Sequence, residues 1–210
     1  MDKNTLSILR DAISEIGSWQ WWHTEKDMFQ MEFSDVLLYN ETKEEKETHT
    51  STIALRFFDN TFAVFLDNYE EIADKKWYEQ FYDDEILILP IDMDEFCFND
   101  TEYAKTLFSS FKNKTSIKDF EALDKINTTE YIMAAKCSGI GFIVGGDRLT
   151  VIGNKGKYSD EELELASKRW WQYWRDYWKL RDTPDAYKKD WACEVTIPAD
   201  KDNPIGKWHE

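Results

Sequence analysis

Hydrophobic positions repeat with a helical period in some segments of the chain and alternate with a strand period in others. The clearest helical pattern lies between Ser159 and Arg181, where apolar residues cover about half of a helical wheel. Ser159 and Glu162 have the spacing of a capping box. Acidic residues in the first turns precede basic ones in the last, as the helix dipole favours. The sequence therefore predicts a long, tryptophan-rich C-terminal helix.

A helical-wheel projection of this segment places some aromatic residues at the centre of the apolar arc and others at its edge. Trp170, Trp174 and Tyr177 lie at the centre of the apolar arc and are predicted to be core. Trp171 and Trp178 lie at one edge, beside charged side chains, and are predicted to be partly exposed. Because an ordinary surface helix buries a stripe of only about 100°, this helix must contact more than one layer or expose some indoles.

The first part of the chain is predicted to form one helix followed by strands. Residues 2–16 place their apolar side chains on one helical face. Alternating residues then mark strands over 18–25 and 28–40, and the second alternation slips near Ser34 and Asp35. A β-bulge at this point would explain the slip.

A pair of apolar segments, 51–58 and 61–67, flanks Asp59 and Asn60. These two residue types tolerate left-handed dihedral angles, so the pattern predicts a β-hairpin. Two further elements are predicted before Phe98, a short helix over 69–82 and a strand over 86–89.

Beyond residue 98 the pattern changes mainly to helices. The sequence predicts a helix capped by Asp100, a second one after a capping box at Ser116 and Asp119, and a third over 129–138 that ends at Gly139. Residues 141–153 predict a second hairpin that turns through 145–147, and residues 192–197 a final strand.

These elements predict an α+β fold. A mainly antiparallel sheet, made of the N-terminal strands and the later hairpin, would pack against several helices, including the long C-terminal one. A length of 210 residues and the absence of linkers or repeats favour a single domain over 1–210. Its strand-rich half would be 1–98 and its helix-rich half 99–210.

Net charge is distributed very unevenly along the chain. Residues 1–100 contain 24 acidic and 8 basic residues, whereas residues 101–210 contain 18 of each, so the net charge of −16 lies entirely in the first half. Such asymmetry indicates an acidic surface that faces a partner, although acidity also keeps proteins soluble. The candidate partner-binding residues are Glu44, Glu45, Glu47, Glu70, Glu71, Asp83, Asp84, Glu85, Asp92, Asp94 and Glu95.

Motifs that would indicate catalysis are absent from the sequence. His23, His49 and His209 share no metal-ligand spacing, and no nucleotide-binding motif or nucleophile elbow occurs. We therefore predict no catalytic residues, no metal site and no cofactor, while an enzymatic role stays open. Nucleic acid is disfavoured as a partner because neutralising phosphates requires a basic surface.

Location is predicted from the start of the chain and from its cysteines. The N-terminus does not resemble a signal peptide, and no apolar run approaches the roughly 18 residues of a membrane span. Three widely spaced cysteines favour reduced thiols. The sequence thus predicts a cytoplasmic protein without membrane contact.

Three hypotheses for function remain. The leading one is a non-enzymatic interaction module whose acidic half binds a basic protein, similar in physical class only to the acidic proteins that neutralise toxins. The alternative is a ligand-binding or hydrolytic domain that stacks sugars or other planar groups on Trp19, Trp21, Trp22, Trp171 and Trp178. The third is a homo-oligomer that associates through the excess apolar arc of the C-terminal helix.

Overall fold

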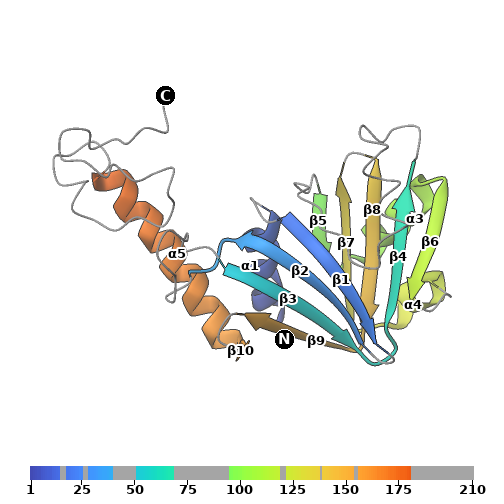
Figure 1. Cartoon of the computed structure of the whole chain (residues 1–210), viewed down its shortest axis with the longest axis horizontal. Helices are drawn as coiled ribbons and strands as arrows, with labels where there is room; N and C mark the ends of the chain where they lie inside the picture. The colour runs from blue at the N-terminus through green and yellow to red at the C-terminus, as the bar shows by residue number, and fades with distance from the viewer. Residues whose placement is uncertain are drawn as a thin grey trace.

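The computed structural model describes residues 1–14, 18–25, 28–39, 51–68, 95–118, 122–137, 139–153 and 156–180. Within these residues the chain forms two five-stranded antiparallel sheets and four helices (Figure 1). Sheet A has the order β1 (Ser18–Glu25), β2 (Met28–Val36), β3 (Ser51–Phe58), β9 (Arg148–Gly153), β10 (Gly156–Lys157). Sheet B has the order β5 (Glu95–Phe98), β7 (Tyr131–Cys137), β8 (Ile140–Gly146), β4 (Phe62–Asp67), β6 (Asn113–Lys118). The predicted α+β class is confirmed.

Both hairpins predicted around Asp59 and Gly145 are wrong, although their strands and turns exist. β3 pairs with β2 and β9 in sheet A, whereas β4 pairs with β6 and β8 in sheet B. The turn at Asp59 and Asn60, with φ of 57° and 50°, carries the chain from one sheet to the other instead of folding it back. The β8–β9 connection does the same, so these segments form a corner shared by the two sheets.

Polar contacts at the corner join the two crossing segments. The Asp147 amide donates to the Asp59 carbonyl at 2.9 Å, and the Asp59 carboxylate forms an ion pair with Arg148. This guanidinium lowers the pKa of Asp59, mainly through the side-chain hydrogen bond. The Arg148 guanidinium also lies 5.1 Å from the centre of the Phe58 ring.

Close backbone approach explains two of the glycines at the corner. A Cβ on Gly146 would lie 2.8 Å from the carbonyl oxygen of Phe58, and one on Gly145 would lie 2.3 Å from the Phe62 ring. These glycines therefore serve packing between crossing strands, and not the hairpin turn that the sequence predicted. A turn between two paired strands does occur earlier in the chain, between β7 and β8, where Gly139 has a φ of 89°.

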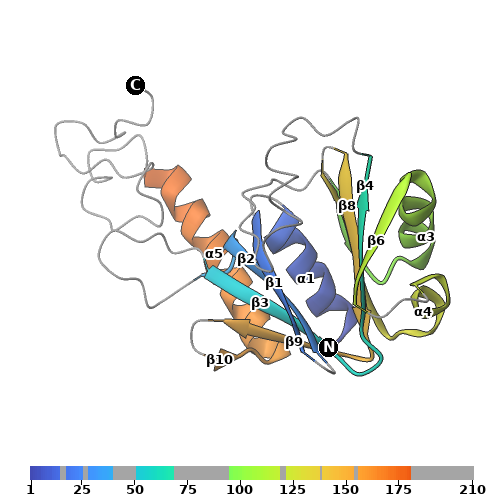
Figure 2. The ribbon, with the colours of Figure 1, turned by 45° about the vertical axis from the view of Figure 1, so that its right-hand side comes forward.

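Helix α1 (Lys3–Ser14) fills the open side of the angle between the two sheets (Figure 2). The main hydrophobic core contains residues from α1 and from the inner faces of both sheets, among them Leu9, Ile13, Phe29, Leu55, Met133 and Val144. An N-terminal helix had been predicted over 2–16, and its described part is confirmed. Asp2 caps it by accepting the Thr5 amide at 2.8 Å, a bond that also lowers the pKa of Asp2.

Sheet B is buried on both faces. Met133 and Ala135 of β7 face the main core, while Ile132 and Ala134 face a second core. This second core is closed by α3 (Thr101–Ser110) and α4 (Ala122–Thr128), which cover the outer face of the sheet (Figure 2). The predicted cap of α3 is confirmed, since the Asp100 carboxylate accepts the Tyr103 amide at 2.8 Å.

One predicted helix in this region is wrong, and so is the predicted cap of another. Residues 131–137, assigned to a helix over 129–138, form β7. The helix predicted around Leu123 is present as α4, but Ser116, expected to cap it, lies in β6 opposite Val64. A strand buried on both faces lacks the alternation that identifies an exposed strand, so burial overrides the helix preference of Met, Ala and Lys.

The bulge predicted in β2 is confirmed. The β2–β3 register shifts between Phe33 and Val36, and Asp35 adopts a φ of 55°. The helix of residues 69–82 and the strands of 86–89 and 192–197 lie outside the described residues.

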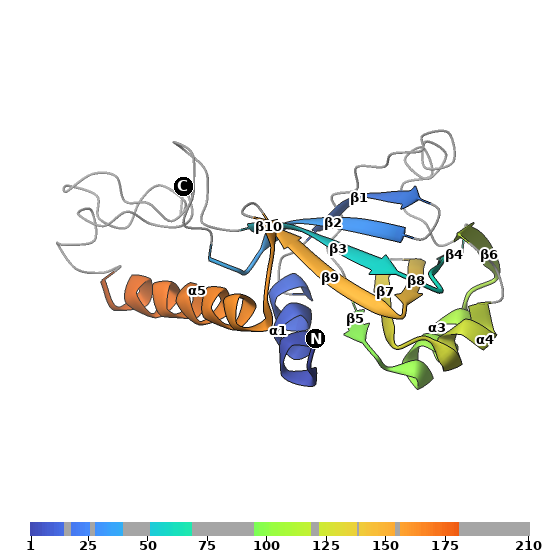
Figure 3. The same ribbon diagram turned by 90° about the horizontal axis from the view of Figure 1, so that it is seen from below.

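Helix α5 (Asp160–Leu180) packs its first half beside α1 and extends its second half away from both sheets (Figure 3). Its capping box is confirmed, because Ser159 Oγ accepts the Glu162 amide at 3.2 Å and Glu162 accepts the Ser159 amide at 2.7 Å. The Tyr39 amide donates to the Ala166 carbonyl at 3.1 Å. This last contact joins the first half of α5 to the segment that follows β2.

Candidate functional site

Most of the acidic candidates lie in segments without a described position. Ten of the eleven, all except Glu95, are outside the described residues. Glu95 opens β5, where its backbone pairs with Lys136 of β7. Of the acidic candidates the structure therefore places only Glu95, and it also describes Asn68, which precedes the acidic segment 69–94.

The segment 69–94 begins and ends at one end of sheet B. The amide of Asn68 donates to the carbonyl of Gly139 at 2.9 Å, and Glu95 pairs with Lys136, two residues before the β7–β8 turn. Nine acidic and two basic residues lie between these anchors, a net charge of −7. We call this edge, defined by Asp67, Asn68, Glu95 and Gly139, the Asn68 end.

Polar contacts hold the Asn68 end in place. Asp67 is 1% exposed and its carboxylate accepts the Asn113 side-chain amide at 2.8 Å. The Asn68 side-chain oxygen accepts the Lys112 amide at 2.9 Å. The residues on either side of the acidic segment, Asn68 and Glu95, are therefore both bonded to neighbouring parts of the fold.

Burial on α5 differs in part from the pattern predicted by its wheel. Trp170 is 1% exposed and Tyr173 is 8% exposed, while Trp174 is only half-buried. Trp171 and Trp178 are 42% and 57% exposed, as predicted for the edge of the arc. The buried face is thus rotated toward Tyr173, away from the Trp174 side of the apolar arc.

Trp174 and Trp178 are neighbouring aromatic residues of α5. The Trp174 and Trp178 rings lie 6.5 Å apart with planes at 33°, so they form a tilted pair on one side of the helix. The side chain of Tyr177 lies outside the description, and its predicted core position stays a prediction.

The tryptophans of β1 are described by their backbone register. Trp19 pairs with Phe33 and Trp22 with Met31, whereas Trp21 pairs with Glu32, because the register shifts between Trp19 and Trp21. Simple alternation had grouped Trp19 with Trp21, and the backbone register shift lies between these two residues.

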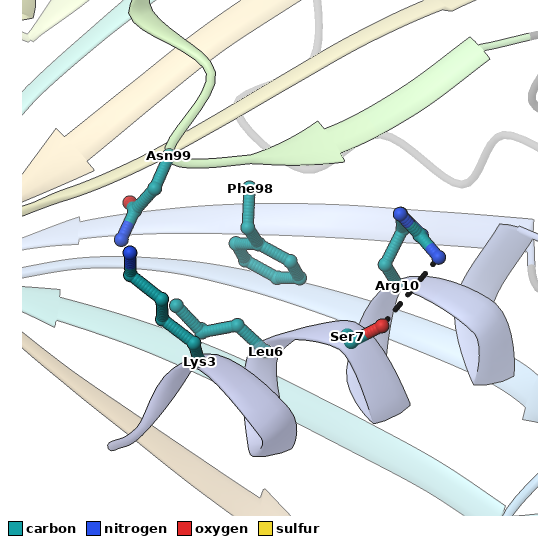
Figure 4. A pocket seen from close by; sticks show the side chains of 6 residues that line it. All are labelled: Lys3, Leu6, Ser7, Arg10, Phe98 and Asn99. Atoms are coloured by element: carbon teal, nitrogen blue, oxygen red, sulfur yellow. Dashed lines mark hydrogen bonds between the residues drawn. The ribbon is translucent and has the colours of Figure 1, made fainter.

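A pocket that the sequence analysis missed lies between α1 and the end of β5 (Figure 4). Its volume is about 260 Å³, and its lining residues are Lys3, Leu6, Ser7, Arg10, Phe98 and Asn99. The four α1 residues have the spacing i, i+3, i+4, i+7, so they lie along one face of the helix, and this spacing is visible in the sequence. Only the fold brings residues 98 and 99 to this stripe, so periodicity alone could not have located the pocket.

Other side-chain chemistry is sparse in the part of the chain that the structure describes. There, no group of three or more His, Cys, Asp and Glu side chains is arranged to hold a metal ion. Cys97 is half-buried in β5. None of the described helices is both long and apolar enough to span a membrane.

Comparison with known proteins identifies neither a family nor a function for this chain. No protein-family model, curated protein or solved structure matches the chain. Function is therefore argued from charge, exposure and geometry.

Proposed function

We propose that this chain is a non-enzymatic interaction module that binds a basic protein through its acidic N-terminal half. The observation that carries the proposal is the attachment of the segment 69–94 at the Asn68 end. A net charge of −7 over 26 residues, tied at both ends to one edge of a sheet, concentrates negative potential there. Such a field accelerates association with a basic partner and weakens as salt screens it.

Capture experiments test the proposal. The full chain is immobilised and incubated with a lysate of the source cells at low and at high salt, and retained proteins are identified by mass spectrometry. The triple variant Asp83→Asn, Asp84→Asn, Glu85→Gln removes three negative charges from the acidic segment. A basic protein should be retained by the unmodified chain at low salt and lost both at high salt and with this variant.

The matched control removes three charges from the neutral half. Asp124→Asn, Glu130→Gln and Glu161→Gln alter three exposed carboxylates there. Retention of the basic protein should persist with this control, because its charges lie away from the Asn68 end. Failure to retain any basic protein at low salt, or equal loss with both triple variants, would contradict the proposal.

A second candidate function rests on the exposed indoles of α5. Trp171 and Trp178, 42% and 57% exposed, present flat aromatic surfaces to solvent, as residues that stack on sugars or other planar groups do. In this function the chain would be a ligand-binding or hydrolytic domain. Tryptophan fluorescence of the unmodified chain and of Trp178→Ala, titrated with glycans and nucleotides, tests it. Unchanged fluorescence throughout the panel would argue against stacking.

A further inference from the structure

Hydrogen-bond donors surround the pocket between α1 and β5. Its polar side chains are an ammonium, a guanidinium, a hydroxyl and an amide, contributed by Lys3, Arg10, Ser7 and Asn99, and no carboxylate lines it. In a chain of net charge −16 this is an unusual local composition. A ligand must therefore provide acceptors, and two cations favour an acceptor with negative charge.

The orientation of the Asn99 amide is determined by the backbone. Its Oδ1 accepts the amide of Ile132 at 2.8 Å, which leaves the Nδ2 group to face the pocket. Figure 4 shows this nitrogen directed toward Nζ of Lys3. Among the described residues neither group donates to a protein acceptor, so two donors converge on one position that an oxygen ligand would satisfy.

Arg10 lies at the opposite end of the pocket. It is seven residues from Lys3, which is two helical turns or about 10 Å along α1. Its Nε and Nη2 both donate to Asp11, at 2.9 and 2.6 Å, and this pair is exposed. The guanidinium is thus partly neutralised, whereas Lys3 forms no ion pair with any described residue, and the Lys3 end is the stronger position for an anion.

The surface between these two cations is apolar. Leu6 is 7% exposed, and the half-buried Phe98 ring is held edge-on against Phe96, with ring centres 5.1 Å apart. Figure 4 places Phe98 between the basic ends of the pocket. A ring fixed in this way is a preformed platform for a flat or short aliphatic group.

We propose that this pocket binds a small organic carboxylate. The carboxylate accepts from Lys3 Nζ and Asn99 Nδ2, and its apolar body lies on Phe98 and Leu6. A volume of about 260 Å³ is below the roughly 300 to 1,000 Å³ of pockets for drug-sized ligands, so the ligand is small. The site is independent of the proposed function, because Phe98 and Glu95 lie at opposite ends of β5.

Binding is tested with phenylacetate as the probe and with phenylacetamide as its uncharged counterpart. Both are titrated at constant ionic strength into the isotope-labelled full chain, and amide chemical shifts are followed by NMR. Phenylacetate should produce saturable shifts centred on residues 3–10 and on Phe98 and Asn99. Phenylacetamide should bind more weakly, because it retains the ring and lacks the charge.

Variants separate a built site from general attraction of anions. Lys3→Gln should weaken phenylacetate binding by up to about fivefold, the upper limit for an exposed ion pair. Lys157→Gln removes the same charge from an exposed residue of β10 and should leave the affinity unchanged. Spectra of distant amides confirm that both variants are folded.

Three outcomes would overturn the proposal. One is the absence of saturable shifts at the pocket with phenylacetate. Another is equal affinity for phenylacetate and phenylacetamide. The third is an equal effect of Lys3→Gln and Lys157→Gln.

Discussion

Trp170 is predicted to contribute more to stability than any other described tryptophan of α5. It is 1% exposed and lies in the main core, whereas Trp178 on the same helix is 57% exposed. An aromatic side chain of this kind buries about 150 to 250 Å², which at about 25 cal/mol per Å² corresponds to about 4 to 6 kcal/mol.

One structural detail reduces this value for Trp170. Its indole Nε1 is buried and has no hydrogen-bond partner among the described residues, and an unpaired buried donor costs about 1 to 3 kcal/mol. Removing the side chain also removes that cost. Trp170→Ala should therefore lower the free energy of unfolding by about 3 kcal/mol, near the lower limit for such truncations.

Companion variants separate the two contributions. Trp170→Phe keeps most of the apolar ring and deletes the unpaired donor, so its loss should be below about 1.5 kcal/mol. Trp178→Ala should lose less than about 1 kcal/mol, since most of its surface is already solvated. Trp174→Ala should fall between Trp170→Ala and Trp178→Ala, because that side chain is half-buried.

Urea denaturation followed by circular dichroism measures these differences. Each variant should shift the midpoint without changing the slope, as expected when stability changes and the unfolded state does not. Equal losses for Trp170→Ala and Trp178→Ala would refute the orientation of α5. A loss for Trp170→Phe as large as that for Trp170→Ala would refute the argument about the unpaired donor.

Three further predictions concern the corner and the start of α5. Gly146→Ala should lower the free energy of unfolding by about 1 to 3 kcal/mol, because its Cβ would lie 2.8 Å from a backbone oxygen; an unchanged urea midpoint would contradict the close approach. Arg148→Gln should raise the pKa of Asp59 toward its ordinary value of 3.8, measured by carboxyl NMR titration. Since the folded pKa is lowered, the stabilisation is present at neutral pH and disappears as pH falls below 3.8 through the folded value; an unmoved titration would show that Arg148 is not the cause. Ser159→Ala should cost about 1 kcal/mol through loss of the cap, and a midpoint identical to the unmodified chain would argue against it.

The sequence by itself determined elements whose signals are local. The α5 helix follows from its apolar arc and capping box, and the bulge in β2 follows from a phase slip at Asp35. These features depend on side chains within a few residues of one another, so a period of 3.6 or 2 and the chemistry of a cap are sufficient to predict them.

Only the tertiary structure decided the features that depend on strand pairing between residues far apart in the sequence. β7 was predicted as a helix because its buried position between β5 and β8 cannot be recognised from its own residues. The turn at Asp59 and Asn60 has the same local chemistry in a hairpin and in a corner, and only the partners β8 and β9 make it a corner.

The pocket has the same physical origin. Its stripe on α1 is present in the sequence, but Phe98 and Asn99 reach it only because β5 joins the edge of sheet B beside that helix. Loop closure over about ninety residues leaves no periodic trace along the chain, which is why local patterns predicted the elements and the fold decided the site.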